Sequence, residues 1–207
     1  MKLYFVRHGE STANLKHEFS NTGRKHPLTR DGFAQARAVA NSLCCLKVEK
    51  VYSSPVLRAV QTAKILSERV QAPLEITPAL QEWDVGVYEG TSDSAGWELH
   101  RQVQDDWFIH NKFDSKMPGG ESYNEILGRF VPFIEKLGQD DRNSNYTYIM
   151  VAHGGLYLAM LPAIFKNVDY AFARQHGFPY AACAVAESRL DGLWCTSWCG
   201  ISLMNML

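Results

Sequence analysis

The sequence of 207 residues has no excess of either charge. Its 21 basic residues are balanced by 22 acidic ones, and the formal net charge is −1. Proteins that hold nucleic acid or an anionic membrane through their overall field carry a clear basic surplus. We therefore expect no nucleic-acid partner and no membrane partner, and any anion site must be local.

Long apolar runs are also lacking, because no uninterrupted one approaches the roughly 20 residues of a membrane span. The four apolar residues before Arg7 are too few for the apolar region of a signal peptide. We expect a cytoplasmic protein. The tail 193–207 has no charge, but polar residues interrupt it. We interpret it as an edge strand, with a homodimer contact as the alternative.

Cysteine is present in an odd number, five, and no two cysteines have the Cys-x-x-Cys spacing. This pattern argues against a zinc site, a redox motif or a disulfide framework. We expect reduced thiols, most of them buried.

What the sequence does contain is strands that end in functional side chains. Residues 2–6 are apolar and run into Arg7-His8. "KVYSS" ends at Ser54, and "YTYIMVA", residues 146–152, runs into His153. The last segment has the β-rich, apolar composition of a covered central strand.

Helices are predicted between these strands. Thr29 is the expected N-cap of a helix whose apolar residues continue to Leu43. Ser54 and Pro55 are expected to open a second helix, with Arg58 in its first turn. A capping box at Ser122 and Glu125 opens another, and one more begins near residue 156.

This alternation predicts an α/β protein. We expect a three-layer sandwich with a mostly parallel central sheet and helices on both faces. A further strand is predicted around 74–77, and an antiparallel hairpin turns at Asp191-Gly192. We expect one domain over 1–207, with a helical lid excursion at about 83–120.

Ligands of such sheets bind beyond the carboxyl ends of the strands, so Arg7, His8, Arg58 and His153 are expected to meet there. Each of them alone is more often a structural or solvated residue. Together, two guanidiniums and two imidazoles repel one another unless an anion lies among them. A phosphoryl group fits best, because arginine binds its oxygens in a bidentate manner.

Five motifs in order carry a resemblance to a known family. They are "RHGES" at 7–11, "SSPVLRAVQTA" at 53–63, "LQEWDVGVYEG" at 80–90, "PGGES" at 118–122 and "VAHGG" at 151–155. With them the chain resembles the histidine phosphatase superfamily, which includes the cofactor-dependent phosphoglycerate mutases.

The resemblance implies roles for individual residues. His8 would be the nucleophile that takes the phosphoryl group, Glu82 the proton donor, and Arg7, Arg58 and His153 the phosphate pocket. Asn14 matches a further pocket position, and Thr22 and Gly23 match a substrate loop. The usual Trp-x-Asp spacing after that loop is absent, and Arg24-Lys25-His26 stands there instead.

Other residues have plainer interpretations. Glu10 is a rival proton donor by position, but we favour a role in bracing its loop. We expect His17, His26, His100, His110 and His176 to be structural or solvated. The aromatic residues Trp83, Trp97, Trp107 and Phe108 are expected to form core or lid packing.

We expect a metal-independent phosphatase, without a cofactor, that hydrolyses a small-molecule phosphate ester. A phosphoglycerate mutase-type phosphotransferase is the alternative, because both reactions use a phosphohistidine. Mutases of the family carry an arginine-rich insertion, whereas residues 91–117 hold one arginine, Arg101, with Lys112 and Lys116. A second alternative is a protein that binds a phosphorylated ligand without catalysis.

Overall fold

A computed structural model describes residues 1–23, 25–139 and 146–204. Within them, seven strands form one sheet in the order β3-β2-β4-β1-β5-β6-β7. The first four in this order are parallel to one another: β3 (Leu74–Ile76), β2 (Lys50–Ser53), β4 (Thr147–Ala152) and β1 (Lys2–Arg7). The antiparallel strands are β5 (Cys183–Arg189), β6 (Gly192–Trp198) and β7 (Ile201–Ser202).

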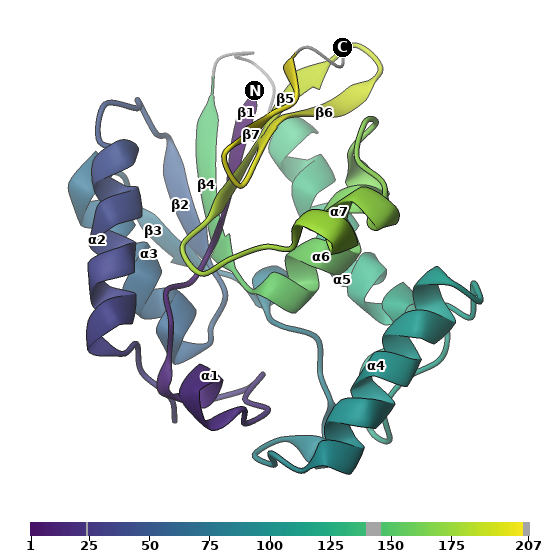
Figure 1. Cartoon of the computed structure of the whole chain (residues 1–207). Coiled ribbons are helices and arrows are strands. Elements are labelled where there is room, and N and C mark those ends of the chain that lie inside the picture. Colours follow the sequence, from purple (N-terminus) through teal and green to yellow (C-terminus); the bar gives the residue numbers. More distant parts are fainter. Residues whose placement is uncertain (24, 140–145, 205–207) are drawn as a thin grey trace.

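Helices cover both faces of the sheet, which confirms the predicted α/β sandwich (Figure 1). One face packs against α2 (Arg30–Ser42) and α3 (Leu57–Val70), whose Ala40 and Leu66 meet Val51 in the core. The opposite face packs against α5 (Tyr123–Gln139) and α6 (Gly154–Ile164). Side chains of β1 and β4 contribute alternately to the two cores, because successive residues of a strand point to opposite faces of the sheet.

Shorter elements complete the chain. They are α1 (Thr12–Lys16), α4 (Ser94–Phe108), α7 (Tyr170–His176) and short 3-10 turns at Pro78–Leu80 and Gly86–Tyr88. Helix α4 lies within the excursion predicted at about 83–120, and its function as a lid stays a prediction. Neither α1 nor α7 was expected, since each is too short to show helical periodicity in the sequence.

Two of the predicted helix starts can be compared directly with the structure. The Ser122–Glu125 capping box is confirmed, because the Ser122 N–H donates to Glu125 Oε2 at 2.7 Å and the Glu125 N–H donates to Ser122 Oγ at 3.3 Å. The helix start at Ser54 was wrong. Helix α3 begins at Leu57 with Val56 as its N-cap, and the Ser54 hydroxyl contacts both the Val56 N–H, at 3.3 Å, and the His153 ring.

Among the described residues, no helix combines the length and the apolar character needed to cross a membrane. The five cysteines, all in the described part of the chain, are free thiols. The expectation that most are buried was wrong, because Cys195 alone among them is fully buried and Cys45 is exposed. Burial raises the pKa of Cys183, Cys195 and Cys199, with Cys195 and Cys199 at about 12.

Candidate active site

The carboxyl ends of β1, β2 and β4 bring the predicted residues together. The ring centroids of His8 and His153 lie 5.1 Å apart, and the Arg58 guanidinium contacts both rings. We call Arg7, His8, Arg58, Glu82 and His153 the His8 cluster. Both histidines and Arg58 are buried, so the charge of the cluster is shielded from water.

The hydrogen bonds of His8 fix which ring nitrogen carries the proton. Nδ1 lies 2.6 Å from the Gly9 carbonyl oxygen and donates to it. The lone pair is therefore on Nε2, which accepts from Arg58 Nε at 3.0 Å. Burial, followed by the Arg58 and Arg7 guanidiniums, holds the pKa of His8 well below its ordinary value. His8 is thus a neutral imidazole, and its Nε2 lone pair is held by the Arg58 N–H, a donor that could turn to a bound anion.

A pair of glycines fixes the loop that carries His8. A β-carbon added to Gly9 would lie 2.4 Å from the carbonyl oxygen of Gly32 in α2. One added to Gly32 would lie 1.9 Å from the Glu10 carbonyl oxygen. The loop and the first turn of α2 are therefore in direct contact, backbone against backbone.

His153 lies between Arg58 and Ser54. Its Nδ1 accepts from Arg58 Nη2 at 3.3 Å, so Nε2 carries the proton and donates to Ser54 Oγ at 2.7 Å. Burial and then Arg58 hold the pKa of His153 well below its ordinary value. Ser54 orients this ring, a role that the sequence pattern did not indicate.

Arg58 connects the two imidazoles to the loop after α1. Its Nη1 donates to the Ser20 carbonyl oxygen at 2.6 Å. Burial lowers the pKa of Arg58 to about 10, which leaves the guanidinium charged at neutral pH. The cluster thus holds fixed cationic N–H donors beside the His8 lone pair.

Glu82 lies beside the start of α6. Its Oε2 accepts from the Gly155 N–H at 3.0 Å, and Oε1 accepts from the Trp83 N–H at 3.2 Å. A β-carbon at Gly155 would approach both carboxyl oxygens to 2.9 Å, so glycine there makes room for the acid. Burial raises the pKa of Glu82 and outweighs these N–H groups and the guanidiniums.

Arg7 is held by a segment that the sequence analysis did not single out. Its Nη1 donates to the Phe178 carbonyl oxygen at 2.5 Å, and its Cζ lies 4.1 Å from the centroid of the Tyr180 ring. Burial lowers the pKa of Arg7 from its ordinary value. Arg7 and Tyr180 therefore form a cation–π pair next to His8.

Three other predicted site residues are not brought into the cluster by their described contacts. Asn14 Oδ1 accepts from the backbone and hydroxyl of Ser11, at 3.0 and 2.8 Å, at the start of α1. The Thr22 hydroxyl donates to Glu89 Oε1 at 2.9 Å, and Gly23 follows in an exposed turn. Their binding roles stay predictions, and Arg24 lies outside the described residues.

Glu10 braces its loop, as we had favoured. Its Oε1 accepts from the Thr29 hydroxyl at 2.7 Å, and its backbone N–H donates to Gln35 Oε1 at 2.8 Å. Both contacts tie the loop after β1 to the start of α2. The carboxylate is thus engaged away from the His8 cluster.

A layer of stacked rings lies behind Glu82. The Trp83 and His100 centroids are 4.4 Å apart, and those of Phe19 and Trp97 are 3.9 Å apart. Trp107 packs on Trp83 at 4.9 Å. Burial lowers the pKa of His100 to about 4, so the ring is neutral. This aromatic layer, made of Phe19, Trp83, Trp97, His100 and Trp107, confirms the predicted packing role of its tryptophans.

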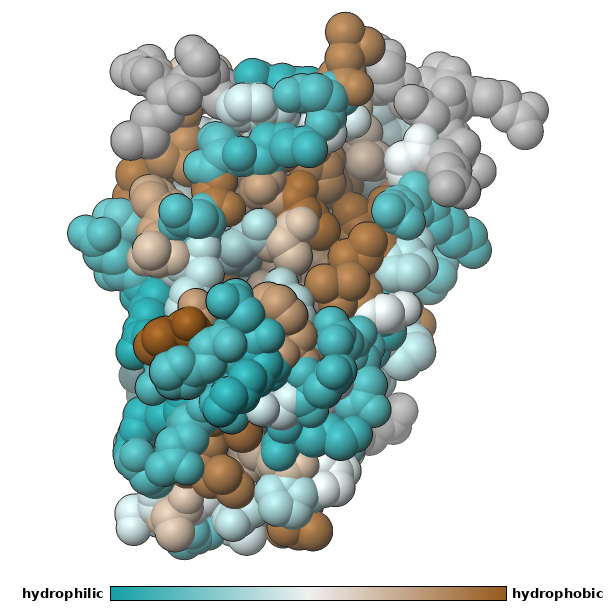
Figure 2. All heavy atoms as spheres, turned by 90° about the vertical axis from the view of Figure 1, so that its right-hand side faces the viewer, coloured by the Kyte–Doolittle hydropathy of each residue, from teal (hydrophilic) through white to brown (hydrophobic). Residues whose placement is uncertain are grey.

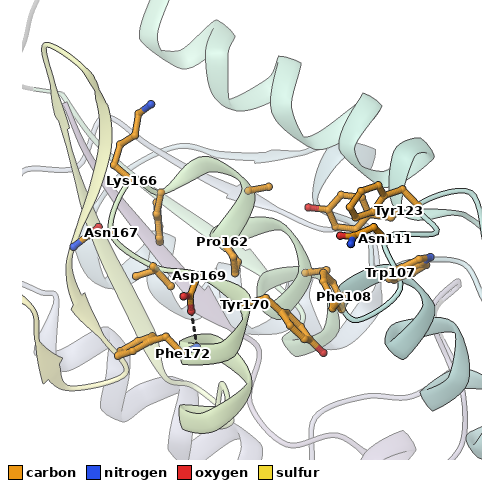
Figure 3. A pocket seen from close by; sticks show the side chains of 15 residues that line it. Trp107, Phe108, Asn111, Tyr123, Pro162, Lys166, Asn167, Asp169, Tyr170 and Phe172 are labelled. Carbon is orange, nitrogen blue, oxygen red and sulfur yellow. Dashed lines mark hydrogen bonds between the residues drawn. The ribbon is translucent and has the colours of Figure 1, made fainter.

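A cavity of about 770 Å³ opens elsewhere, between α4, α6 and α7. In Figure 3, Trp107 and Phe108 stand on one side, and Lys166 and Asn167 on the other. Figure 2 shows the face that carries α4 and α7, where hydrophobic residues run down the upper middle. The His8 cluster does not line this cavity, so the chemistry that we describe lies apart from it.

The described residues contain no group of three or more His, Cys, Asp and Glu side chains that could hold a metal ion. The charged groups that gather around His8 are guanidiniums, which bind anions. We therefore interpret the cluster as an anion site that also holds a neutral imidazole and a carboxyl group with a raised pKa.

Comparisons with known proteins agree with this geometry. The sequence profile described as histidine phosphatase superfamily (branch 1) matches residues 3–199. A Hydrogenobacter thermophilus protein that carries the name "Putative phosphoserine phosphatase 2" is 36% identical over 162 residues, 77% of this chain and 76% of its own length. A Brucella canis protein named 2,3-bisphosphoglycerate-dependent phosphoglycerate mutase is 34% identical over 169 residues, 78% and 80% of the two chains.

Two solved structures share the fold. A mycobacterial glucosyl-3-phosphoglycerate phosphatase in complex with VO3 superposes with a TM-score of 0.80 at 22% identity, covering 95% of this chain and 98% of the other. The alpha-ribazole phosphatase of Shigella flexneri has a TM-score of 0.78 at 22% identity, with 98% of both chains covered.

Proposed function

The chain belongs to the histidine phosphatase superfamily (branch 1), and from that premise we propose that it hydrolyses a small-molecule phosphomonoester through a phosphohistidine on His8. The observation that carries the proposal is the Nε2 lone pair of His8, 3.0 Å from a buried guanidinium. A neutral nucleophile beside fixed cations suits attack on an anionic phosphorus centre.

In the first step, His8 Nε2 attacks phosphorus in line with the ester oxygen. The new N–P bond forms as the P–O bond breaks, and Glu82 gives its proton to the leaving alkoxide. Arg7, Arg58 and His153 stabilise the charge on the equatorial oxygens. The raised pKa of Glu82, caused by burial, keeps this acid protonated at a higher pH than an ordinary carboxyl.

In the second step, water attacks the phosphohistidine. The Glu82 carboxylate takes a proton from that water, the O–P bond forms, and His8 leaves as a neutral imidazole. Inorganic phosphate departs, and Glu82 is again protonated. One acid thus serves both half-reactions, and His8 and Glu82 return to their starting states.

Hydrolysis is favoured over phosphoryl transfer between two substrates by the side chains of the 91–117 segment. Arg101 pairs with Glu98, Lys112 pairs with Asp106 at 3.0 Å, and Lys116 pairs with Glu125 at 3.0 Å. All three cations already have an acidic partner. The mutase activity named for the Brucella relative would need a second phosphate site, and these pairs do not offer one.

The proposal is tested by phosphate release from p-nitrophenyl phosphate and phosphoserine, with EDTA present, by the wild type and His8→Ala. We expect turnover that survives EDTA and is lost in the variant. Acid-labile phosphate trapped on the wild-type protein would identify the intermediate. Turnover that persists in His8→Ala contradicts the proposal.

The same assays distinguish the two alternatives. A mutase primed with 2,3-bisphosphoglycerate interconverts phosphoglycerates faster than it releases phosphate. A binding protein without catalysis holds phosphate esters and turns over none of them at any pH. We further propose a cytoplasmic location, which the free thiols of the described cysteines support.

A further inference from the structure

The strand β5 brings an additional segment to the His8 cluster. It runs antiparallel to β1, and Cys183 at its start pairs with Val6 at the end of β1. The beginning of an antiparallel strand therefore lies at the same sheet edge as the ends of the parallel ones. Residues 177–182, which precede β5, are delivered to Arg7 and His8.

Backbone hydrogen bonds fix this segment to the nucleophile strand. The Arg7 N–H donates to the Ala182 carbonyl oxygen at 3.0 Å, and the Ala181 N–H donates to the His8 carbonyl oxygen at 3.3 Å. Ala181 has a φ of 54°, in the left-handed region that alanine seldom adopts. Such strain costs on the order of 1 kcal/mol and is concentrated at functional sites. Here it sits directly after Tyr180.

Arg7 is packed closely against two parts of the chain. The Tyr180 ring centroid lies 4.1 Å from Cζ. A β-carbon at Gly154 would lie 2.9 Å from both Cζ and Nε of Arg7. The aromatic ring and the start of α6 therefore both restrict the guanidinium.

The edges of the guanidinium are not used equally. Nη1 donates to the Phe178 carbonyl oxygen at 2.5 Å. Nε is buried, and among the described residues it is the one buried side-chain nitrogen or oxygen with no hydrogen-bond partner. An arginine presents Nε–H and one Nη–H as a parallel pair that matches two phosphate oxygens. The Phe178 carbonyl oxygen uses Nη1, so it does not occupy the Nε–Nη2 pair.

We infer that Tyr180 is a positioning residue, which stacks on Arg7 and presets its Nε–Nη2 pair for two oxygens of the phosphoryl group bound beside His8. The inference rests on the proposed function and adds a residue to it. The ring of Tyr180, at 6.4 Å from the His8 ring, acts through Arg7 and takes no proton from the substrate. An aromatic face holds a desolvated cation without supplying a competing anion.

The test measures the dissociation constant of inorganic phosphate by calorimetry for the wild type, Tyr180→Leu, Tyr180→Phe and Arg7→Ala. We expect Tyr180→Leu to weaken phosphate binding at least tenfold, and Tyr180→Phe to weaken it clearly less, because Phe keeps the ring and loses only the hydroxyl, which also interacts with Arg7. In an Arg7→Ala background, Tyr180→Leu should add less than twofold. Additive losses, or equal losses for Leu and Phe, overturn the inference.

Tyr170→Leu is the matched control. Tyr170 is also a partly buried tyrosine stacked on another side chain, with its centroid 3.5 Å from that of Phe108, but it lies in α7 beside the cavity of Figure 3. We expect it to lower the melting temperature and leave phosphate affinity unchanged. Calorimetry needs no turnover, so loss of the proposed hydrolysis and loss of the Tyr180 effect are separate results.

Discussion

Two neighbouring regions of this protein bury a histidine beside different side chains, buried guanidiniums in one and aromatic rings in the other. In the His8 cluster, buried guanidiniums add to burial in lowering the pKa of His8 and His153. In the aromatic layer, burial lowers the pKa of His100, and the charge that adds to it belongs to the exposed Arg101, which pairs with Glu98. A neutral buried histidine is therefore common to both regions and does not identify a site.

The two regions differ in the electrostatic cost of burying their side chains. The aromatic layer is complete, because its rings pack on one another. The His8 cluster holds cations that an anion would neutralise, together with a buried Arg7 Nε that has no partner among the described residues. Substitutions should therefore separate the two regions, with lost activity in the cluster and lost stability in the layer.

Arg58→Met should give the largest effect. It removes the cation that bonds both imidazoles, so we expect turnover to fall by about 10³-fold or more. The free energy of unfolding should stay equal or rise, because a desolvated charge is removed. Steady-state kinetics and chemical denaturation measure the two quantities. A large loss of stability would mean that Arg58 is mainly structural.

Trp107→Ala tests the aromatic layer. The side chain is fully buried, and its Nε1 donates to the Ser115 carbonyl oxygen at 2.6 Å. We expect the free energy of unfolding to fall by about 3–5 kcal/mol. Turnover per folded molecule should stay near the wild-type value well below the melting temperature. Loss of turnover in folded protein would show that the layer takes part in catalysis.

Glu82→Gln tests the acid of the His8 cluster, which is next in sequence to Trp83 of the aromatic layer. General acid catalysis contributes about 10²–10⁴-fold, and it matters most when the leaving group is a poor one. We expect a decrease of about 10²-fold or more in kcat for phosphoserine, and a smaller one for p-nitrophenyl phosphate. Because the active form of Glu82 is protonated, wild-type kcat should fall as pH rises through its raised pKa. The variant should lose that limb, and equal decreases for both substrates would argue against the role.

His100→Phe should give the smallest effect. The pKa of His100 is about 4 in the folded protein and ordinarily about 6.5, so below pH 6.5 the unfolded chain binds a proton that the folded one does not. Wild-type stability therefore falls from pH 6.5 toward 4. The free energy of unfolding of the variant should exceed that of the wild type by an amount that grows as pH falls through this range, to roughly 2–3 kcal/mol. His8 and His153 are present in both proteins, so the difference in unfolding free energy between them reports on His100 alone. A difference that does not change with pH would contradict the prediction.

The cluster could largely be predicted because its residues follow strongly apolar strands. Arg7 ends β1, His8 follows it, and His153 follows β4, whose residues are all buried. Parallel strands in one sheet end at the same edge, so the convergence of these side chains follows from the strand order alone. To predict this convergence it was enough to know at which residue each strand ends.

The parts that were missed depend on contacts between distant segments. The Ser54 hydroxyl suits an N-cap by local pattern and accepts from the Val56 N–H, but it also accepts from His153, 99 positions later in the chain. Ser20 contributes its carbonyl oxygen, which any residue could supply. Tyr180 stands outside every periodic segment. The one signal for it was the hairpin, since an antiparallel neighbour of β1 must begin where β1 ends.

The contact between Gly9 and Gly32 has an evolutionary consequence. Each glycine is confined by a carbonyl oxygen of the opposite backbone, at 2.4 and 1.9 Å from the absent β-carbon. No substitution of a neighbouring side chain can create that space, so neither position can change first and be compensated later. We expect homologous lineages to retain both glycines while the outer face of α2 diverges. Sequence change in the loop that carries His8 is then limited by its backbone contact with α2.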